Sequence, residues 1–193
     1  MHEDAKAVLQ SEPQMDALVS THGPVTVEPA SDQFRRFVVS IINQSISTAA
    51  ASSIRADFFD LFEQPLSPEA VLQAAPEDLA AVLGAQKAEY VQNGARRFSQ
   101  EDLSAEALAE YSDREVVETL TEIRGVGEWT AEMYLLFGLG REDVFPVGDL
   151  AVRRGMETLY GELTRERMIE KARDWQPYRS YATKYLWAEY ESE

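Results

Sequence analysis

Apolar residues recur every three to four positions along most of the chain, which is the spacing of helices that bury one face. A glycine-containing turn interrupts the pattern, and apolar residues keep the helical spacing on both sides of it: Val116, Val117, Leu120 and Ile123, then Trp129, Met133, Leu136 and Phe137. Alternating polar and apolar positions, which are typical of strands, are missing. The pattern therefore predicts an all-α fold with short loops.

Capping residues and prolines mark where the predicted helices begin. Ser31-Asp32, Ser67-Pro68 and Ser112-Asp113 are such starts. The sequence predicts helices over residues 13–22, 33–43, 44–62, 86–98, 104–110, 149–160, 164–175 and 178–190, two short helices that begin at Pro68 and Pro76, and one that runs from Asp113 into the glycine turn.

Composition narrows the class of protein. The chain has 193 residues, of which 45% are hydrophobic, so it can bury a core as one domain or as two lobes. It has no Cys, which excludes disulfides, thiol catalysis and iron–sulfur clusters, and its two His form no ligand cluster of recognisable spacing. No apolar run is long enough to span a membrane, and the N-terminus does not resemble a signal peptide. We expect a cytoplasmic protein without a membrane partner.

The net charge of −16 argues against a nucleic-acid partner, because affinity for phosphate comes largely from Lys and Arg. One interpretation is an acidic enzyme that acts on a small molecule. Another is adaptation to high internal salt, which screens the repulsion between carboxylates, since only four residues are Lys. The charge alone does not decide between them.

The glycine turn itself has a chemical use. Arg124 to Gly127 join two predicted helices, and Gly125 and Gly127 permit positive φ and close approach of another backbone. The N–H groups of Val126 and Gly127 are expected to point outward at a helix N-terminus, which binds anions without any Lys. An acidic protein could hold DNA in this way. The alternative is an ordinary pair of helices joined by a glycine turn.

Four blocks of sequence carry a family resemblance. In chain order they are "IINQSISTAAASSI", "GAQKAEYVQNGARRF", "LTEIRGVGEWTA" with "DVFPVGDLAVRRG", and "WQPYRSYATKYLWAEY". This is also the order of that family. Together they resemble the helix-hairpin-helix DNA glycosylases, and in particular the 3-methyladenine DNA glycosylase II branch, from about Phe34 to Tyr190.

The resemblance implies two helical lobes around a DNA-binding cleft. We expect lobe one to comprise about residues 1–44 plus 148–193, and lobe two about 45–147, with the helix-hairpin-helix at 115–137. It also implies a compact form without the β domain that longer members carry ahead of the helical lobes.

The resemblance makes Asp149 the catalytic residue. As the base departs, the sugar acquires oxocarbenium character, and a carboxylate nearby stabilises that charge or activates the attacking water. The alternative role is structural, since Asp at the start of a helix is a favoured N-cap. The two roles are compatible, because a helix N-terminus stabilises a carboxylate.

Trp129 stands where related glycosylases that also cut the backbone place a catalytic Lys. The resemblance therefore implies a monofunctional enzyme that leaves an abasic site. The indole face of Trp129 would also attract a cationic alkylated purine. Met133, Tyr134, Phe34 and Phe37 are further candidates for the base pocket, and the alternative for each aromatic residue is core packing.

The resemblance also implies DNA contacts. Extrusion of a nucleotide uses a side chain from the turn that contains Gln44 and Ser45, and Ser45 is smaller than the wedge of many members. Arg124 replaces a Pro that is common in the hairpin and adds a positive charge there. The predicted DNA-contacting residues are Gln44, Ser45, Lys87, Arg124, Gly125, Val126, Gly127 and Thr130.

The predicted function is hydrolysis of the N-glycosidic bond of alkylated purines in double-stranded DNA, as part of base excision repair. We expect a monomer without a cofactor, although a structural monovalent or divalent ion at the hairpin backbone is compatible with the sequence. Two alternatives stay open: a non-catalytic helix-hairpin-helix DNA-binding module, and an acidic all-α hydrolase for a small molecule such as a nucleoside.

Overall fold

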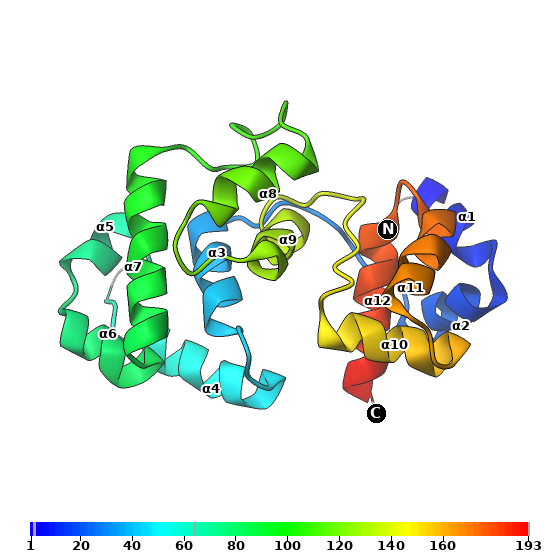
Figure 1. Ribbon diagram of the computed structural model, residues 1–193, viewed down its shortest axis with the longest axis horizontal. Helices are drawn as coiled ribbons and strands as arrows, with labels where there is room; N and C mark the ends of the chain where they lie inside the picture. The colour runs from blue at the N-terminus through cyan, green and yellow to red at the C-terminus, as the bar shows by residue number, and fades with distance from the viewer. Residues whose placement is uncertain (2, 64, 193) are drawn as a thin grey trace. The chain divides into compact units, whose positions relative to one another are not determined.

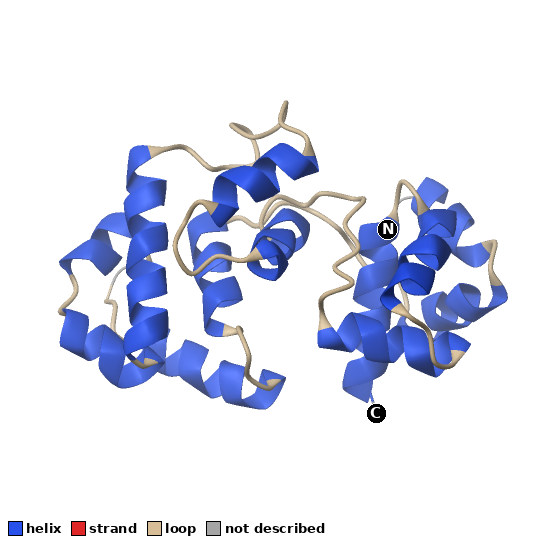
Figure 2. Ribbon diagram, viewed as in Figure 1, coloured by secondary structure: helices blue, strands red, loops and turns tan. Residues whose placement is uncertain are grey.

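The computed structural model describes residues 1, 3–63 and 65–192. Within these residues, all regular structure is helical and no strand occurs (Figure 2), which confirms the all-α prediction. No helix among them is both long and apolar enough to cross a membrane. The chain divides into two compact units: Met1–Glu28 with Gly140–Glu193 form unit 1, and Pro29–Leu139 form unit 2 (Figure 1).

Unit 1 is built around its C-terminal helix. Its helices are α1 (Glu3–Gln10), α2 (Pro13–His22), α10 (Leu150–Tyr160), α11 (Arg165–Ala172), the short 3-10 helix η1 (Arg173–Trp175) and α12 (Arg179–Ser192). α12 packs against both α10 and α2. At the crossing of α10 and α12, a Cβ on Gly155 would lie only 2.7 Å from the carbonyl oxygen of Leu186, so this close approach requires glycine.

Unit 2 is built around α3. Its helices are α3 (Gln33–Ile42), α4 (Thr48–Phe59), α5 (Pro68–Gln73), α6 (Pro76–Leu83), α7 (Ala85–Gln100), α8 (Asp113–Thr121) and α9 (Glu128–Phe137). α3 packs against α4, α7 and α9, and it contributes five buried apolar side chains: Phe34, Phe37, Val38, Ile41 and Ile42. α8 packs against α9.

The unit boundaries differ from the expected lobes. Residues 29–44 belong to unit 2, where α3 packs on α7 and α9, whereas they were assigned to lobe one on sequence. Residues 140–147 belong to unit 1 rather than to lobe two.

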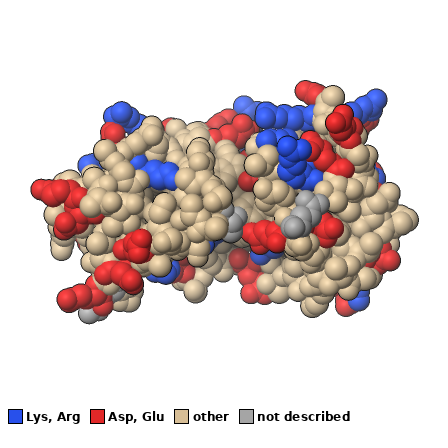
Figure 3. All heavy atoms as spheres, turned by 90° about the horizontal axis from the view of Figure 1, so that it is seen from below, with Lys and Arg blue, Asp and Glu red and all other residues tan. Residues whose placement is uncertain are grey.

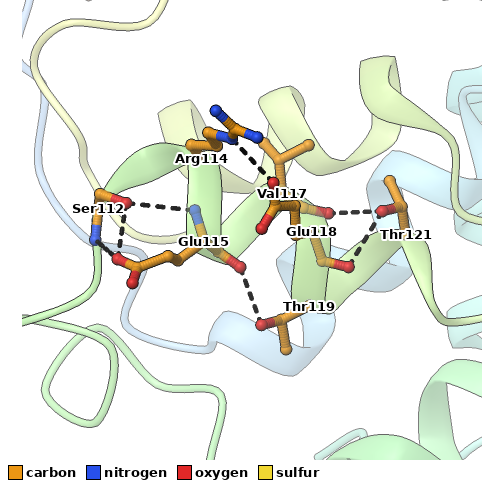
Figure 4. Close-up of polar contacts among 7 residues, drawn as sticks. All are labelled: Ser112, Arg114, Glu115, Val117, Glu118, Thr119 and Thr121. Carbon is orange, nitrogen blue, oxygen red and sulfur yellow. Dashed lines mark hydrogen bonds and ion pairs between the residues drawn. The ribbon is translucent and has the colours of Figure 1, made fainter.

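The predicted helix caps are confirmed at several starts. The Asp32 carboxylate accepts from the Arg35 N–H at 2.8 Å, and the Ser67 hydroxyl accepts from the Ala70 N–H at 3.1 Å. At α8, Ser112 and Glu115 cap each other's backbone N–H groups reciprocally (Figure 4). These local hydrogen bonds satisfy donors that a helix N-terminus would otherwise leave without a partner.

Two helix predictions are wrong. Residues 44–62 do not form one helix, because Ser45 has a φ of 57° and Ser47 caps a new helix by accepting from the Ala50 N–H. Residues 104–110 form turns. There the Ser104 hydroxyl accepts from Ala107, but the Ala109 N–H donates to Glu106, so no regular helix propagates. Helix α1 was not predicted as a separate element.

Candidate functional site

The hairpin between α8 and α9 depends on Gly125. Gly125 has a φ of +99°, in the region that favours glycine. A Cβ at this position would lie 2.1 Å from Cγ of Tyr90 on α7, so the turn lies directly against that ring. Gly125 thus combines the positive φ and the close approach that were predicted for the turn.

Gly127 differs from the prediction. Its φ is −96°, so positive φ is not required there, and a Cβ would meet no atom within 4 Å. The backbone at Gly127 is therefore open on the side where a Cβ would lie.

Only part of the expected set of outward amides is available. The Val126 N–H donates to the Ile123 carbonyl at 2.9 Å, so Val126 closes the turn rather than offering its amide to a ligand. Gly127 is the N-cap residue of α9 and Glu128 its first residue, and their N–H groups make no hydrogen bond within the described part of the chain. The amides that remain candidates for an anion site at the hairpin are therefore those of Gly127 and Glu128.

The carbonyl groups of the hairpin are held by two other elements. Asn93 on α7 donates to the Arg124 carbonyl at 3.1 Å, and Gln44 donates to the Gly125 carbonyl at 2.9 Å. The Arg124 guanidinium, which is exposed, pairs with Glu89 at 2.7 Å. No group of three His, Asp or Glu side chains that could bind a metal occurs among residues 1, 3–63 and 65–192.

The turn between α3 and α4 is attached to the hairpin through Gln44. Its amide nitrogen donates both to the Gly125 carbonyl and, at 2.8 Å, to the hydroxyl of Thr130, whose side chain is buried. Ser45 follows in the left-handed conformation with an exposed side chain. Gln44 thus bonds within the protein, whereas Ser45, like Ser47, is an exposed residue of the turn.

Two cations fix the same turn from other helices. Lys87 on α7 donates to the Ile42 carbonyl at 2.6 Å, and Arg55 on α4 donates to the side-chain oxygen of Asn43 at 2.8 Å. Burial lowers the pKa of Lys87. Cations at the C-terminal end of α3 are favourable for the helix dipole. Lys87 was predicted to contact DNA, and in the structure its ammonium group caps α3.

The candidate pocket residues divide into core and partly exposed positions. Phe37, Met133 and Tyr134 are buried in unit 2, and the Tyr134 hydroxyl donates to the Leu103 carbonyl at 2.8 Å. Burial and the nearby charges of Asp102 and Asp32 raise the pKa of Tyr134. Phe37 and Tyr134 therefore fit the alternative of core packing, and the Met133 side chain is buried with them. Trp129 lies half-buried in the first turn of α9.

Phe34 lies beside a shallow surface pocket of about 440 Å³ on unit 2. Its ring contacts that of Phe98 at a centroid distance of 5.2 Å, and both rings line the pocket together with Asp32, Glu101 and Asp102. Three carboxylates make this pocket unsuitable for DNA phosphate.

Asp149 is the N-cap of α10. Its carboxylate accepts from the Val152 N–H at 3.0 Å, and the residue is only 6% exposed. The capping role predicted for Asp149 is therefore confirmed. Its catalytic role stays a prediction, and a buried carboxylate fixed by a helix terminus is compatible with it.

The loop ahead of Asp149 is held by contacts that sequence reasoning missed. Arg179 at the start of α12 binds the Asp143 carboxylate with two nitrogens, at 2.7 and 3.0 Å. The next residue, Ser180, accepts from the Val144 N–H at 2.9 Å. Arg153 donates to the Gly148 carbonyl at 2.6 Å, one residue before Asp149. The bonds of Arg179 and Ser180 show that the block "WQPYRSYATKYLWAEY" anchors the loop ahead of Asp149.

The charge on one face of the molecule is mixed rather than uniformly acidic. On the face drawn in Figure 3, Lys and Arg side chains lie among Asp and Glu side chains. Because the net charge is −16, the backbone amides of the hairpin are a better candidate for a phosphate site than the surface Lys and Arg side chains.

The structure thus combines an all-helical fold, a glycine-turn hairpin and a capping aspartate at the start of α10. Residues 38–177 match the model of the HhH-GPD superfamily base excision DNA repair protein. The chain belongs to this superfamily.

Several known DNA glycosylases are similar to this chain in sequence or in structure. A DNA-3-methyladenine glycosylase of Saccharomyces cerevisiae is 34% identical over 175 residues, which cover 80% of this chain and 57% of the relative. The structure of the Schizosaccharomyces pombe 3-methyladenine DNA glycosylase Mag1 in complex with abasic DNA superimposes with a TM-score of 0.86 and 27% identity, covering 95% of both chains. A DNA-3-methyladenine glycosidase of Bacillus halodurans is 30% identical with a TM-score of 0.80, covering 98% of this chain and 89% of the other. The chain spans only 55% to 57% of the length of three of the curated relatives it matches.

Proposed function

We propose that the protein is a monofunctional DNA glycosylase that hydrolyses the N-glycosidic bond of alkylated purines in double-stranded DNA. The observation that carries this proposal is Asp149, a buried carboxylate at the N-terminus of α10 in a chain of the HhH-GPD superfamily. The relatives named 3-methyladenine glycosylases, and the Mag1 complex with abasic DNA, support alkylated DNA as the substrate class.

The two units would have different roles, DNA binding in unit 2 and the chemical step in unit 1. In unit 2, the amides of Gly127 and Glu128 would hold a backbone phosphate, and Ser45 would be presented to the duplex. In unit 1, the Asp149 carboxylate would stabilise the oxocarbenium character of the sugar and orient the attacking water. A cationic alkylpurine is already a good leaving group, so an additional general acid is not needed.

Base release from a panel of duplexes tests the proposal. The panel contains 3-methyladenine, 7-methylguanine, hypoxanthine and ethenoadenine, and the assay is run at low and at high salt. Asp149→Asn keeps the helix cap but removes the charge, so it should retain the melting temperature of the parent and lose on the order of 10²–10³ in the single-turnover rate.

The same variant separates the alternatives. A folded Asp149→Asn protein within a factor of a few of the parent rate would remove Asp149 from the mechanism. Specific DNA binding without base release from any lesion would favour the non-catalytic module. Hydrolysis of free nucleosides without affinity for abasic-site DNA would favour the small-molecule hydrolase.

A further inference from the structure

The turn directly ahead of α10 carries Asp149 and has little packing of its own. It spans Pro146 to Asp149, and the Asp149 N–H donates to the Pro146 carbonyl at 2.9 Å. Its third residue, Gly148, is exposed, and a Cβ there would meet no atom within 4 Å. A turn with an unpacked glycine can reorient its peptide planes at little cost. The position of Asp149 therefore depends on what holds this turn.

Arg153, in the first turn of α10, holds it. One nitrogen of its guanidinium donates to the Gly148 carbonyl at 2.6 Å and to the Val147 carbonyl at 3.3 Å. These carbonyls belong to the two central residues of the turn, so one side chain fixes two successive peptide planes. The backbone N–H of Arg153 donates to the Asp149 carbonyl at 3.2 Å, and the Val152 N–H donates to the Asp149 carboxylate at 3.0 Å. Residues 147–149 are thus all bonded to the start of α10.

The partners of Arg153 differ from those of its neighbour. Arg154 is exposed and pairs with Glu157 at 2.7 Å, as a surface arginine commonly does. Within the part of the chain that the structure describes, the Arg153 guanidinium bonds to the two carbonyls and to no carboxylate. A cation near a helix N-terminus is also unfavourable for the helix dipole. Attraction to a carboxylate or to the dipole therefore does not account for the place of Arg153, whereas its two bonds to the turn do.

We infer that Arg153 is a positioning residue for base release, which holds the Asp149 carboxylate in place through the carbonyls of Val147 and Gly148. This inference rests on the proposed function in that Asp149 acts on the sugar. Arg153 acts through Asp149 and not on the substrate. A displacement of about 1 Å from the productive geometry costs on the order of 10²-fold in rate, so a small movement of the turn is enough to matter.

Rate and affinity, measured on the same variants, test the inference. With a duplex that contains 7-methylguanine, Arg153→Met should lower the single-turnover rate about 10- to 100-fold. Its affinity for abasic-site DNA and its melting temperature should stay near those of the parent. Arg153→Lys keeps a donor that can reach one carbonyl and should recover part of the rate. Arg154→Met, which removes the exposed arginine next in sequence, is the matched control and should keep the parent rate.

Amide hydrogen exchange in the free protein gives a readout that needs no DNA. In Arg153→Met, the amides of Asp149 and Val152 should exchange about fivefold faster or more, because the turn that carries their hydrogen bonds is no longer fixed. The amide of Arg35 donates to the Asp32 carboxylate at the start of α3 in unit 2, which is the same kind of cap. Its exchange should not change. NMR measures these amides separately.

The outcomes are distinct. A parent-like rate in a folded Arg153→Met protein would overturn the inference, as would unchanged exchange at both amides. Weaker DNA binding with a parent-like rate, and a slope of log K against log[salt] reduced by about 0.9, would make Arg153 a phosphate contact instead. If Arg153→Met does not fold, Arg153→Lys and Arg153→Gln decide by the same readouts. If the parent releases no base from any lesion, the proposed function fails, whereas faster exchange in Arg153→Met would still support the positioning of Asp149.

Discussion

Gln44 and Thr130 are joined by a hydrogen bond of 2.8 Å that links the turn after α3 to the first turn of α9. The same amide nitrogen also donates to the carbonyl of Gly125. One side chain thus connects the turn that presents Ser45 to the hairpin that would hold phosphate. The sequence resemblance places Gln44 among the DNA contacts. In the structure, Gln44 links the turn that contains Ser45 to the hairpin.

Loss of this link should destabilise the protein and weaken DNA binding together. Gln44→Ala leaves the buried Thr130 hydroxyl and the Gly125 carbonyl without their donor, which should cost about 1–3 kcal/mol of unfolding free energy. Gln10→Ala, which removes an exposed amide bonded to Asp16, is the control and should change stability by less than about 0.5 kcal/mol. Denaturant unfolding and duplex binding measure both effects. A stable Gln44→Ala protein with full DNA affinity would contradict the linking role.

The two hairpin glycines should respond differently to alanine. Gly125→Ala would place a Cβ 2.1 Å from the Tyr90 ring at a φ of +99°, so it should cost about 2 kcal/mol or more in stability. Gly127→Ala has no neighbour within 4 Å of its Cβ and a φ of −96°, so its stability should change little.

Binding then tests the open face at Gly127. If a phosphate approaches that backbone, the added methyl group of Gly127→Ala should weaken binding to damaged and undamaged duplex by about 1 kcal/mol, or roughly fivefold. Thermal melting and fluorescence anisotropy with a labelled duplex give the two readouts. If the folded Gly127→Ala protein binds the duplex as tightly as the parent, the hairpin is a structural turn without a role in phosphate binding.

Local chemistry explains what could be predicted from the sequence. The caps at Asp32, Ser112 and Asp149 involve residues three positions apart, so a short window of sequence contains both partners. The turn that contains Gln44 and Ser45 was expected, but the helix after it was predicted to begin at Gln44 rather than at Thr48, although Ser47, a capping residue ahead of an Ala-rich run, was a usable signal.

Long-range contacts could not be predicted in the same way. Asp143 and Arg179 are separated by 36 residues, and nothing in either segment alone shows that they pair. The same limit applies to Lys87, whose partner is the carbonyl of Ile42, 45 residues away. Helical spacing also cannot distinguish an aromatic residue that packs in the core from one that lines a pocket. In the structure, Phe37 and Tyr134 are buried in the core.

Glu12 should make unit 1 sensitive to acid. Burial alone would raise its pKa, but the hydrogen bonds from Lys171 and Trp175 outweigh that effect, so the pKa of Glu12 is lowered. A lowered pKa in the folded state contributes stability that is present above the unfolded pKa of about 4.3 and is lost as the pH falls through the folded value.

Glu12→Gln should therefore be less stable than the parent at neutral pH, by about 1.5–3 kcal/mol, because the charged acceptor of Lys171 and Trp175 is gone. The difference should shrink below about pH 4, where the parent protonates Glu12 as well. Melting curves between pH 3 and pH 8 check both statements. Glu170→Gln, at an exposed pair with Arg167, should show neither effect. A stability difference that is independent of pH would mean that the Glu12 charge is not the cause.

The chemistry of the reaction should leave no covalent intermediate. Trp129, in the first turn of α9, has no amine to attack the sugar, and the ammonium group of Lys87 is bonded to the Ile42 carbonyl at 2.6 Å. Borohydride should therefore trap no protein–DNA adduct during base release, and strand cleavage should need added alkali. Burial lowers the pKa of Lys87, which would favour its neutral, nucleophilic form, so it is the first residue to examine if an adduct appears. An adduct that Lys87→Arg abolishes would replace the monofunctional assignment with a lyase mechanism through Lys87.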